Sequence, residues 1–241
     1  MPYQERTYRN QTRTDGLVSF NVTVKETDLF ISATKNLEKE ALDAVLQSRF
    51  ILEQYIKTYP EFLSSLAPLT FDQNAPDIIQ KMLRASEQTG VGPMAAVAGA
   101  VAEYIGQELL KSCDEILVEN GGDIFFKVQR ELTISIFAGE SPLSEKIGVK
   151  VSKKETPCSI CTSSGKVGPS LSLGSADAVT ILSASPTLAD AAATSIGNMI
   201  KTGSDIQKGI DFAQKISGID GIIIIKGEQL GVWGDVELVQ L

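Results

Sequence analysis

The residues best suited to chemistry lie in residues 187–198, which read TLADAAATSIGN. Alanine and leucine dominate this stretch, so we expect a helix. Asp190 and Thr194 are four residues apart, and their oxygen atoms therefore project from one face of the first helical turns. A carboxylate, a hydroxyl and the free N–H groups of a helix start can together hold a hard cation and a phosphate.

The same residues also have a purely structural interpretation. Thr187 precedes Asp190 by three residues, which is the spacing of an N-terminal capping box. In that case Asp190 caps the helix, and the Thr194 hydroxyl donates back to the Asp190 carbonyl. For this pair alone we favour the structural interpretation.

Two further segments carry glycine and small polar residues. Asn120, Gly121 and Gly122 join two expected strands, and Asn-Gly-Gly is typical of a tight hairpin turn with positive φ. Residues 157–175 form the longest stretch expected to be irregular, and their backbone N–H groups could surround an anion. This segment contains Lys166 but matches neither a Walker P-loop nor a dinucleotide-binding G-x-G-x-x-G sequence.

The cysteines give a weaker indication of chemistry. Cys158 and Cys161 have C-x-x-C spacing, which fits a redox pair or half of a metal site. A second C-x-x-C is absent from the sequence, and no helix is expected directly after the first. We therefore expect two reduced thiols near a buried strand, and a redox or sulfur-carrying protein is the least favoured of three hypotheses.

The chain of 241 residues contains no histidine. Ser-His-Asp and Cys-His catalysis and histidine-ligated metal sites are thereby excluded. A metal ion must be held by oxygen atoms or by few thiolates, which favours Mg²⁺ over Zn²⁺.

Charge and hydropathy narrow the possible partners. The formal net charge of -8 disfavours nucleic acid or an anionic membrane as the main partner. The first ten residues lack the apolar segment of a signal peptide, and no apolar run reaches the roughly 18 residues of a membrane-spanning helix. The sequence therefore predicts a cytoplasmic protein that contacts neither nucleic acid nor membrane.

The periodicity of apolar residues predicts an α+β fold with antiparallel sheets and packed helices, because short connections join successive strands. Helices are expected at residues 37–59, 76–88, 94–110, 187–198 and 204–217. Strands are expected at residues 17–24, 29–33, 115–119, 123–128, 132–138, 147–151, 178–184, 221–226 and 232–239. We expect a single domain, residues 1–241, with two closely associated lobes that span roughly residues 1–156 and 157–241.

Three stretches, in this order along the chain, resemble the ApbE-like family of FAD:protein FMN transferases. Residues 117–124 (LVENGGDI) are similar to its N-x-G-G-D segment, and residues 162–165 (TSSG) to its T-S-G segment. Residues 178–184 and 188–194 (AVTILSA and LADAAAT) resemble its V-T-V strand and A-D-A-x-x-T helix. Each motif alone is weak, but three in order form a fairly specific signal, and the resemblance implies an ApbE-like fold.

The resemblance also implies a metal site. In the family, Mg²⁺ is bound by the Asp and Thr of the A-D-A-x-x-T helix and by an alanine carbonyl that precedes a Lys-Gly pair. These roles would fall on Asp190, Thr194 and Ala95 if residues 98–99 (Ala-Gly) occupy the Lys-Gly position. Glu103 would then occupy the acidic position that follows.

The flavin nucleotide, FAD or FMN, would be lined by residues of the two polar segments: Asn120, Gly121, Gly122, Asp123, Ser163, Ser164 and Gly165. The implied reaction is attack of a threonine of an acceptor protein on the FAD pyrophosphate, with release of AMP. Mg²⁺ would neutralise charge that develops on the phosphate oxygens. The resemblance identifies no catalytic side chain.

The chain departs from the family pattern at two points. Ala98 stands where the family has lysine, and residues 167–174 replace a histidine followed by D-P-x-T-G. Loss of a cation and an acid-base group weakens stabilisation of a phosphoryl-transfer transition state. The pattern is closest to a compact, uncharacterised ApbE-like subgroup associated with sulfur assimilation and homocysteine formation. The alternative function is therefore a ligand-binding or accessory protein that lacks transferase activity.

Overall fold

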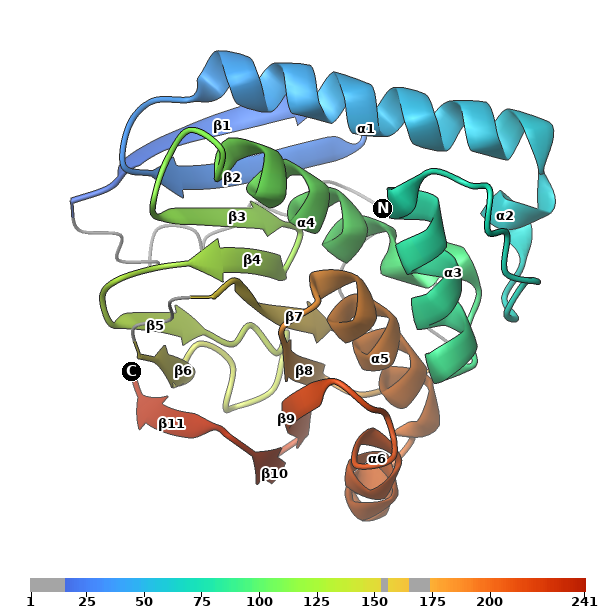
Figure 1. Cartoon of the computed structure of the whole chain (residues 1–241). Coiled ribbons are helices and arrows are strands. Elements are labelled where there is room, and N and C mark those ends of the chain that lie inside the picture. The colour runs from blue at the N-terminus through green and yellow to red at the C-terminus, as the bar shows by residue number, and fades with distance from the viewer. Residues whose placement is uncertain (1–15, 153–155, 165–173) are drawn as a thin grey trace.

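A computed structural model describes residues 16–152, 156–164 and 174–241 (Figure 1). Its largest sheet has eight strands in the order β1-β2-β3-β4-β7-β8-β9-β10, and every neighbouring pair is antiparallel. These strands are Val18–Val24, Thr27–Ala33, Ile116–Asn120, Asp123–Lys127, Cys158–Ser163, Ala178–Ser183, Ile219–Lys226 and Gln229–Gly234.

A second, antiparallel sheet has the order β11-β6-β5, with strands Glu237–Gln240, Ile147–Val151 and Leu132–Ser135. The α-helices are α1 Glu38–Thr58, α2 Glu61–Ser64, α3 Asp77–Thr89, α4 Val97–Leu109, α5 Pro186–Met199 and α6 Ile206–Ala213. The part of the chain that the structure describes also contains the short 3-10 helices η2 Pro93–Ala96 and η3 Gly203–Asp205. The predicted α+β fold with antiparallel sheets is confirmed.

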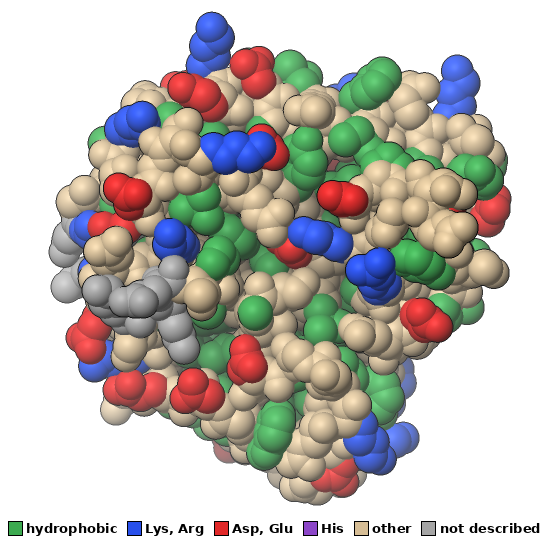
Figure 2. Space-filling model, viewed as in Figure 1, with side chains coloured by type: hydrophobic (Ala, Val, Ile, Leu, Met, Phe, Trp, Pro, Cys, Tyr) green, Lys and Arg blue, Asp and Glu red, His purple; other side chains and the backbone are tan. Residues whose placement is uncertain are grey.

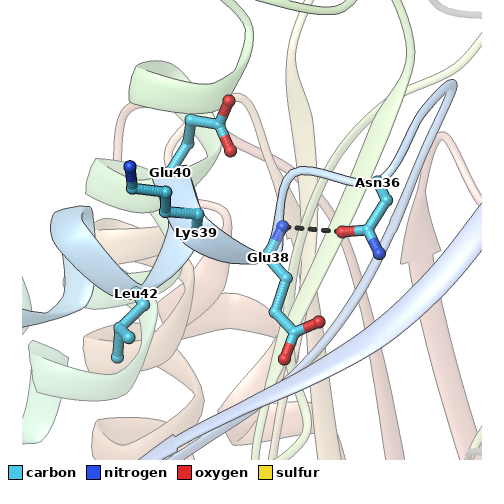
Figure 3. Close-up of a pocket in the computed structure, with 5 residues that line it drawn as sticks. All are labelled: Asn36, Glu38, Lys39, Glu40 and Leu42. Atoms are coloured by element: carbon cyan, nitrogen blue, oxygen red, sulfur yellow. Dashed lines mark hydrogen bonds between the residues drawn. The ribbon is translucent and has the colours of Figure 1, made fainter.

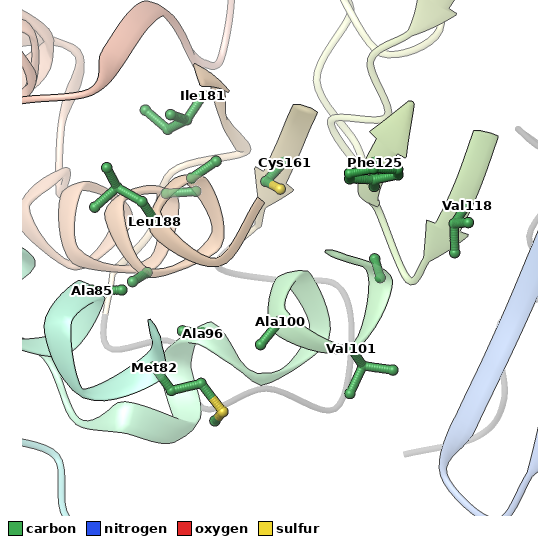
Figure 4. Packing of buried hydrophobic residues seen from close by; sticks show 14 of the residues in the cluster. Met82, Ala85, Ala96, Ala100, Val101, Val118, Phe125, Cys161, Ile181 and Leu188 are labelled. Carbon is green, nitrogen blue, oxygen red and sulfur yellow. The ribbon is translucent and has the colours of Figure 1, made fainter. Parts of the chain in front are cut away.

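The large sheet separates two hydrophobic clusters. Along β9, Ile222 and Ile224 belong to the cluster on the helix side, whereas Ile223 and Ile225 belong to the cluster on the other side. This assignment follows from the alternation of side chains along a strand, and it explains the run of four isoleucines. Figure 4 shows part of the helix-side cluster, in which side chains of α4 and α5 lie against β7 and β4.

Small residues let α4 approach its neighbours closely. A Cβ atom on Gly106 would lie 2.1 Å from the ring of Phe125 on β4, and a Cβ atom on Gly99 would lie 2.3 Å from the Pro186 carbonyl oxygen. The two glycines are seven residues apart and share one face of the helix. The glycine-rich composition of this helix is thus a packing requirement.

The structure corrects two predicted elements. Residues 157–175 were expected to be irregular, but β7 lies within them, between β4 and β8. Its small polar side chains hide the usual apolar alternation of a strand. Their hydroxyl groups form hydrogen bonds with β8: Thr162 with the Thr180 hydroxyl, and Ser159 with the Ser183 carbonyl. The strand expected at 232–239 is divided at Gly234, where φ is +91°, into β10 and β11 of different sheets.

The large sheet takes four strands from before residue 156 and four from after it. The division into lobes at that residue stays a prediction. Among the described residues, no helix is both long enough and apolar enough to cross a membrane.

Candidate functional site

The site is organised by the start of α5. Ser185 is the N-cap, and its hydroxyl oxygen accepts a hydrogen bond of 3.3 Å from the Leu188 N–H. Pro186 follows at the first helical position, where the missing N–H has no cost. The predicted capping box of Thr187 and Asp190 is therefore wrong, because the helix begins before Thr187 and its cap is Ser185.

The carboxylate of Asp190 instead reaches the start of the neighbouring helix α4. Its Oδ2 atom accepts a hydrogen bond of 2.9 Å from the Gly99 N–H, and the Ala98 N–H also interacts with it. These N–H groups belong to the first turn of α4, which carries the positive end of the helix dipole. The contact needs glycine at position 99, since a Cβ atom there would lie 2.8 Å from the Asp190 Cβ.

A second buried carboxylate lies beside Asp190. Burial and the charge of Asp190 raise the pKa of Asp123 well above its usual range, and burial raises the pKa of Asp190 to about 7. Asp123 Oδ1 is buried and has no hydrogen-bond partner among the described residues. Two neighbouring buried carboxylates are not both ionised without a counter-charge, so the pair holds either a proton or a cation.

The β3–β4 hairpin brings Asp123 to this position. Gly121 and Gly122 have φ values of +69° and +110°, which confirms the predicted turn. The Asn120 side chain donates a hydrogen bond of 3.0 Å to the Ala98 carbonyl at the start of α4. The turn is thus attached to the same helix start that Asp190 contacts.

The other predicted binding residues are half-buried and lie on adjacent elements. Ser163 is the last residue of β7. Its Oγ atom would lie 4.0 Å from a Cβ atom added to Gly197 on α5. Thr194 is one turn after Asp190 on α5, and Ala95 is in η2, which packs against α5. The binding roles of these residues and of Ser164 stay predictions.

Gly165 and Lys166 lie outside the described residues. So does most of the segment that replaces the family's histidine motif, because the described chain stops at residue 164 and resumes at residue 174. The predicted role of Gly165 in lining the nucleotide therefore stays a prediction.

Cys161 is a neighbour of the site that the sequence did not reveal. It is opposite Asp123 in the β4–β7 pairing and is fully buried. Burial, followed by the charges of Asp123 and Asp190, raises the pKa of its thiol well above the usual range. A thiol in such surroundings stays protonated and is a poor nucleophile.

The geometry weighs against a redox pair. Cys161 belongs to the helix-side cluster, whereas Cys158 packs against the cluster on the opposite side of the sheet. Residues three apart on a strand project from opposite faces, so a bond between these sulfur atoms would require the backbone to move. Neither cysteine forms a disulfide.

Glu103 has a role at this site that sequence reasoning did not predict. Its carboxylate accepts hydrogen bonds from the Thr187 hydroxyl (2.7 Å) and the Ser185 hydroxyl (3.3 Å), and Lys81 Nζ lies 2.6 Å away. Glu103 thereby holds the start of α5 against α4. The resemblance placed Glu103 at the family's acidic position, but nothing in the sequence showed that it contacts the start of α5.

The residues around Asp190 fit a hard cation. The orphaned Asp123 oxygen, the Asp190 carboxylate and the nearby Thr194 hydroxyl offer oxygen donors, which Mg²⁺ prefers. No group of three or more histidine, cysteine, aspartate or glutamate side chains among the described residues is arranged to hold a metal. A cation here would therefore need hydroxyl, carbonyl or substrate oxygens to complete its coordination.

A surface hollow lies away from these residues. It measures about 400 Å³ and is formed by residues at the start of α1 (Figure 3). None of the predicted binding residues lines it.

Comparison with protein-family models shows to which family the chain belongs. A model described as "AbpE bacteria" matches residues 9–218, which is most of the chain. The chain belongs to this ApbE-like family. Its relatives include UPF0280 proteins of Methanococcus aeolicus and Methanococcus maripaludis, which are 38% and 41% identical. The alignments cover 91% and 89% of this chain and 88% and 90% of those proteins.

Solved ApbE structures share the fold. The flavin transferase ApbE from Vibrio cholerae superimposes with a TM-score of 0.58 at 14% identity, over 92% of this chain and 97% of that one. The apo form of the Pseudomonas stutzeri flavinyl transferase ApbE gives a TM-score of 0.59 at 12% identity, over 92% and 94%. The ApbE-like fold expected from the three motifs is thus confirmed, although identities this low speak for the fold alone.

Proposed function

We propose that this ApbE-like protein binds FAD together with Mg²⁺ and transfers FMN to a threonine of an acceptor protein. The observation that supports the proposal most strongly is the meeting of Asp123 and Asp190 at the start of α4. Two buried carboxylates, one with an unpaired oxygen, favour a divalent cation at this point. A cation held there would in turn attract a pyrophosphate.

The proposal assigns the cation to Asp190 and Thr194, with the Ala95 carbonyl as a third ligand. The N–H groups of residues 98–99 orient the Asp190 carboxylate and favour its charged form. Asp123 would be the nearest additional carboxylate.

The nucleotide is assigned to the polar edge formed by two segments. One is the β3–β4 turn, residues 120–123, and the other is the end of β7 with the residues after it, 163–165. The first segment is anchored to β7 through the Thr162 N–H, which donates a hydrogen bond of 3.1 Å to the Gly122 carbonyl. Glycine in the turn leaves room for a ligand to approach the backbone.

In the proposed reaction the threonine oxygen attacks the FMN phosphorus, the pyrophosphate bond breaks and AMP leaves. When bound, Mg²⁺ supplies charge neutralisation at the phosphate oxygens. The chain's own groups bind and orient: Asp190 fixes the cation, and the turn at 120–123 positions the nucleotide. The names of the solved relatives, flavin transferases, support this reaction class.

Ala98, which stands where the family has lysine, should lower the rate of FMN transfer. It is half-buried at the start of α4, where the family's lysine would add a cation. Lys81 does not substitute for that lysine, because it forms an ion pair with Glu103 on the side of α5's first turn. We therefore expect transfer to be slow relative to enzymes that retain the lysine and the histidine.

The test is release of AMP from FAD in the presence of Mg²⁺ and an acceptor that contains an Asp-Gly-Ala-Thr sequence. This chain has no such sequence of its own, so the acceptor must be added. AMP release that requires both Mg²⁺ and the acceptor threonine would support the proposal. Stabilisation of the protein by FAD and Mg²⁺ without AMP release would instead identify a ligand-binding protein. If FAD and Mg²⁺ cause neither AMP release nor stabilisation, the transferase function and the ligand-binding function are both refuted.

A further inference from the structure

The outer face of α1 carries an apolar stripe. Leu42, Leu46 and Phe50 are 40%, 49% and 64% exposed. They are spaced by four residues and therefore form one row along the helix. Buried residues such as Ala41 and Val45 are on the opposite side, facing the core. Figure 2 shows hydrophobic side chains at the surface in its upper right part, above α1 and α2.

We propose that this stripe is the two-fold interface of a homodimer, in which α1 packs antiparallel against α1 of a second copy. A two-fold axis through Leu46 places Leu46 opposite itself and Leu42 opposite Phe50 of the second copy. The sequence of the stripe is thus self-complementary, as an isologous contact requires. A row at this spacing can pack as a short helical seam.

Charges at both ends of the stripe select the antiparallel direction. Lys39 is three residues before Leu42, and Glu53 is three residues after Phe50, so both extend the row. The antiparallel arrangement brings Lys39 opposite Glu53 of the second copy, twice per dimer. A parallel arrangement would place like charges opposite each other, which is unfavourable.

Glu53 is already held in position by its own chain. Lys25 and Arg49 contact its carboxylate at 3.0 and 3.1 Å, yet its side chain remains 48% exposed. Less side-chain freedom is then lost when Lys39 of the second copy approaches.

A shallow, open depression lies beside Leu42 at the start of α1. Asn36, Glu38, Lys39, Glu40 and Leu42 line its volume of about 400 Å³ (Figure 3). Because Leu42 faces Phe50 across the proposed axis, the Phe50 ring of the second copy would pack against Leu42 at the edge of this depression. Large aromatic side chains in such positions are typical of the residues that dominate interface energies.

The interface is independent of the proposed flavin site. In Figure 1, α1 runs above β1 and β2 at one end of the large sheet, whereas α5 covers β7 and β8. Dimerisation would leave both copies of the site accessible.

The test is the molar mass of the full-length protein, measured by light scattering during gel filtration. We expect twice the mass of one chain for the natural sequence. Leu46→Glu places two carboxylates on the axis and should weaken association at least about 100-fold, giving a monomer. Leu230→Glu is the matched control, because Leu230 is 39% exposed on β10 at the other edge of the sheet and should stay dimeric.

Circular dichroism establishes that each variant is folded. A monomeric natural protein, or a folded Leu46→Glu variant that stays dimeric, would overturn the proposal. The arrangement is tested separately with Leu46→Cys and Gln47→Cys, each combined with Cys158→Ser, and a short bifunctional thiol reagent. Cross-linking at position 46 supports an axis through Leu46, and equal or stronger cross-linking at position 47 contradicts it.

Discussion

Asp190 and Glu103 lie on adjacent helices, and each one binds the first turn of the other's helix. Glu103 on α4 accepts hydrogen bonds from Ser185 and Thr187 at the start of α5. Asp190 on α5 accepts one from the Gly99 N–H at the start of α4. This exchange satisfies helix N-termini that would otherwise be buried without partners, and it fixes the angle at which Asp190 enters the site.

Asp190→Asn should weaken the stabilisation of the protein by Mg²⁺ and FAD. The amide oxygen can still accept the Gly99 hydrogen bond, but the charge that would hold the cation is lost. We expect the apparent affinity for Mg²⁺ to fall at least about tenfold, while the ligand-free protein is unchanged or more stable because repulsion with Asp123 is relieved. Thermal unfolding with and without ligands measures both effects, with the exposed Asp211→Asn as control.

Gly99→Ala and Gly197→Ala compare a helical glycine that has no room for a Cβ atom with one that has room for it. An added Cβ at Gly99 would lie 2.3 Å from the Pro186 oxygen, whereas the nearest atom at Gly197 is 3.9 Å away. Gly99→Ala should therefore cost about 1–3 kcal/mol, and Gly197→Ala should be neutral or stabilising by up to about 1 kcal/mol. Chemical denaturation tests this order, and equal losses would contradict the contact between α4 and α5.

Glu103→Ala should be far more harmful than loss of its ion-pair partner. The change leaves the Thr187 hydroxyl and N–H without their buried acceptor, at a cost of about 2–3 kcal/mol. Lys81→Met should cost less than about 1 kcal/mol, because Lys81 is 39% exposed. If the two variants lose the same free energy of unfolding, the loss comes from the Lys81–Glu103 ion pair and not from the hydrogen bonds between Glu103 and Thr187.

Glu115 makes stability depend on pH. Hydrogen bonds from Arg130 (2.7 and 3.0 Å), and one from the Gln129 N–H, lower its pKa below the usual 4.5. A lowered pKa means that the contribution is complete above about pH 4.5 and disappears as the pH falls through the folded-state value. We expect Glu115→Gln to cost about 1–2 kcal/mol at pH 7 and progressively less below pH 4.5.

Denaturation of the Glu115→Gln variant and the natural protein across this pH range measures the effect. Glu131→Gln is the control, since Glu131 pairs with Lys150 but is 66% exposed. Its effect should be below about 0.5 kcal/mol at every pH. A constant difference between the natural protein and Glu115→Gln from pH 7 to pH 3 would contradict the role of the ionised carboxylate.

Much of the fold could be read from local patterns. The β3–β4 turn is determined by Asn120, Gly121 and Gly122, because a two-residue hairpin needs positive φ and glycine adopts it without strain. The long helix α1 ends before Pro60, as its spacing predicts. β7 could not be read this way, because its Ser159 and Thr162 hydroxyls form their hydrogen bonds with the neighbouring strand β8, which the local sequence does not show.

The sequence by itself determined the antiparallel α+β class, the family, and the chemical types available: oxygen ligands, no histidine and few thiols. Only the tertiary structure decided what Asp190 contacts. Its partners Gly99 and Asp123 are 91 and 67 residues away along the chain, and such distant contacts leave no local pattern. The same holds for Glu103, whose partners Ser185 and Thr187 are more than 80 residues away along the chain.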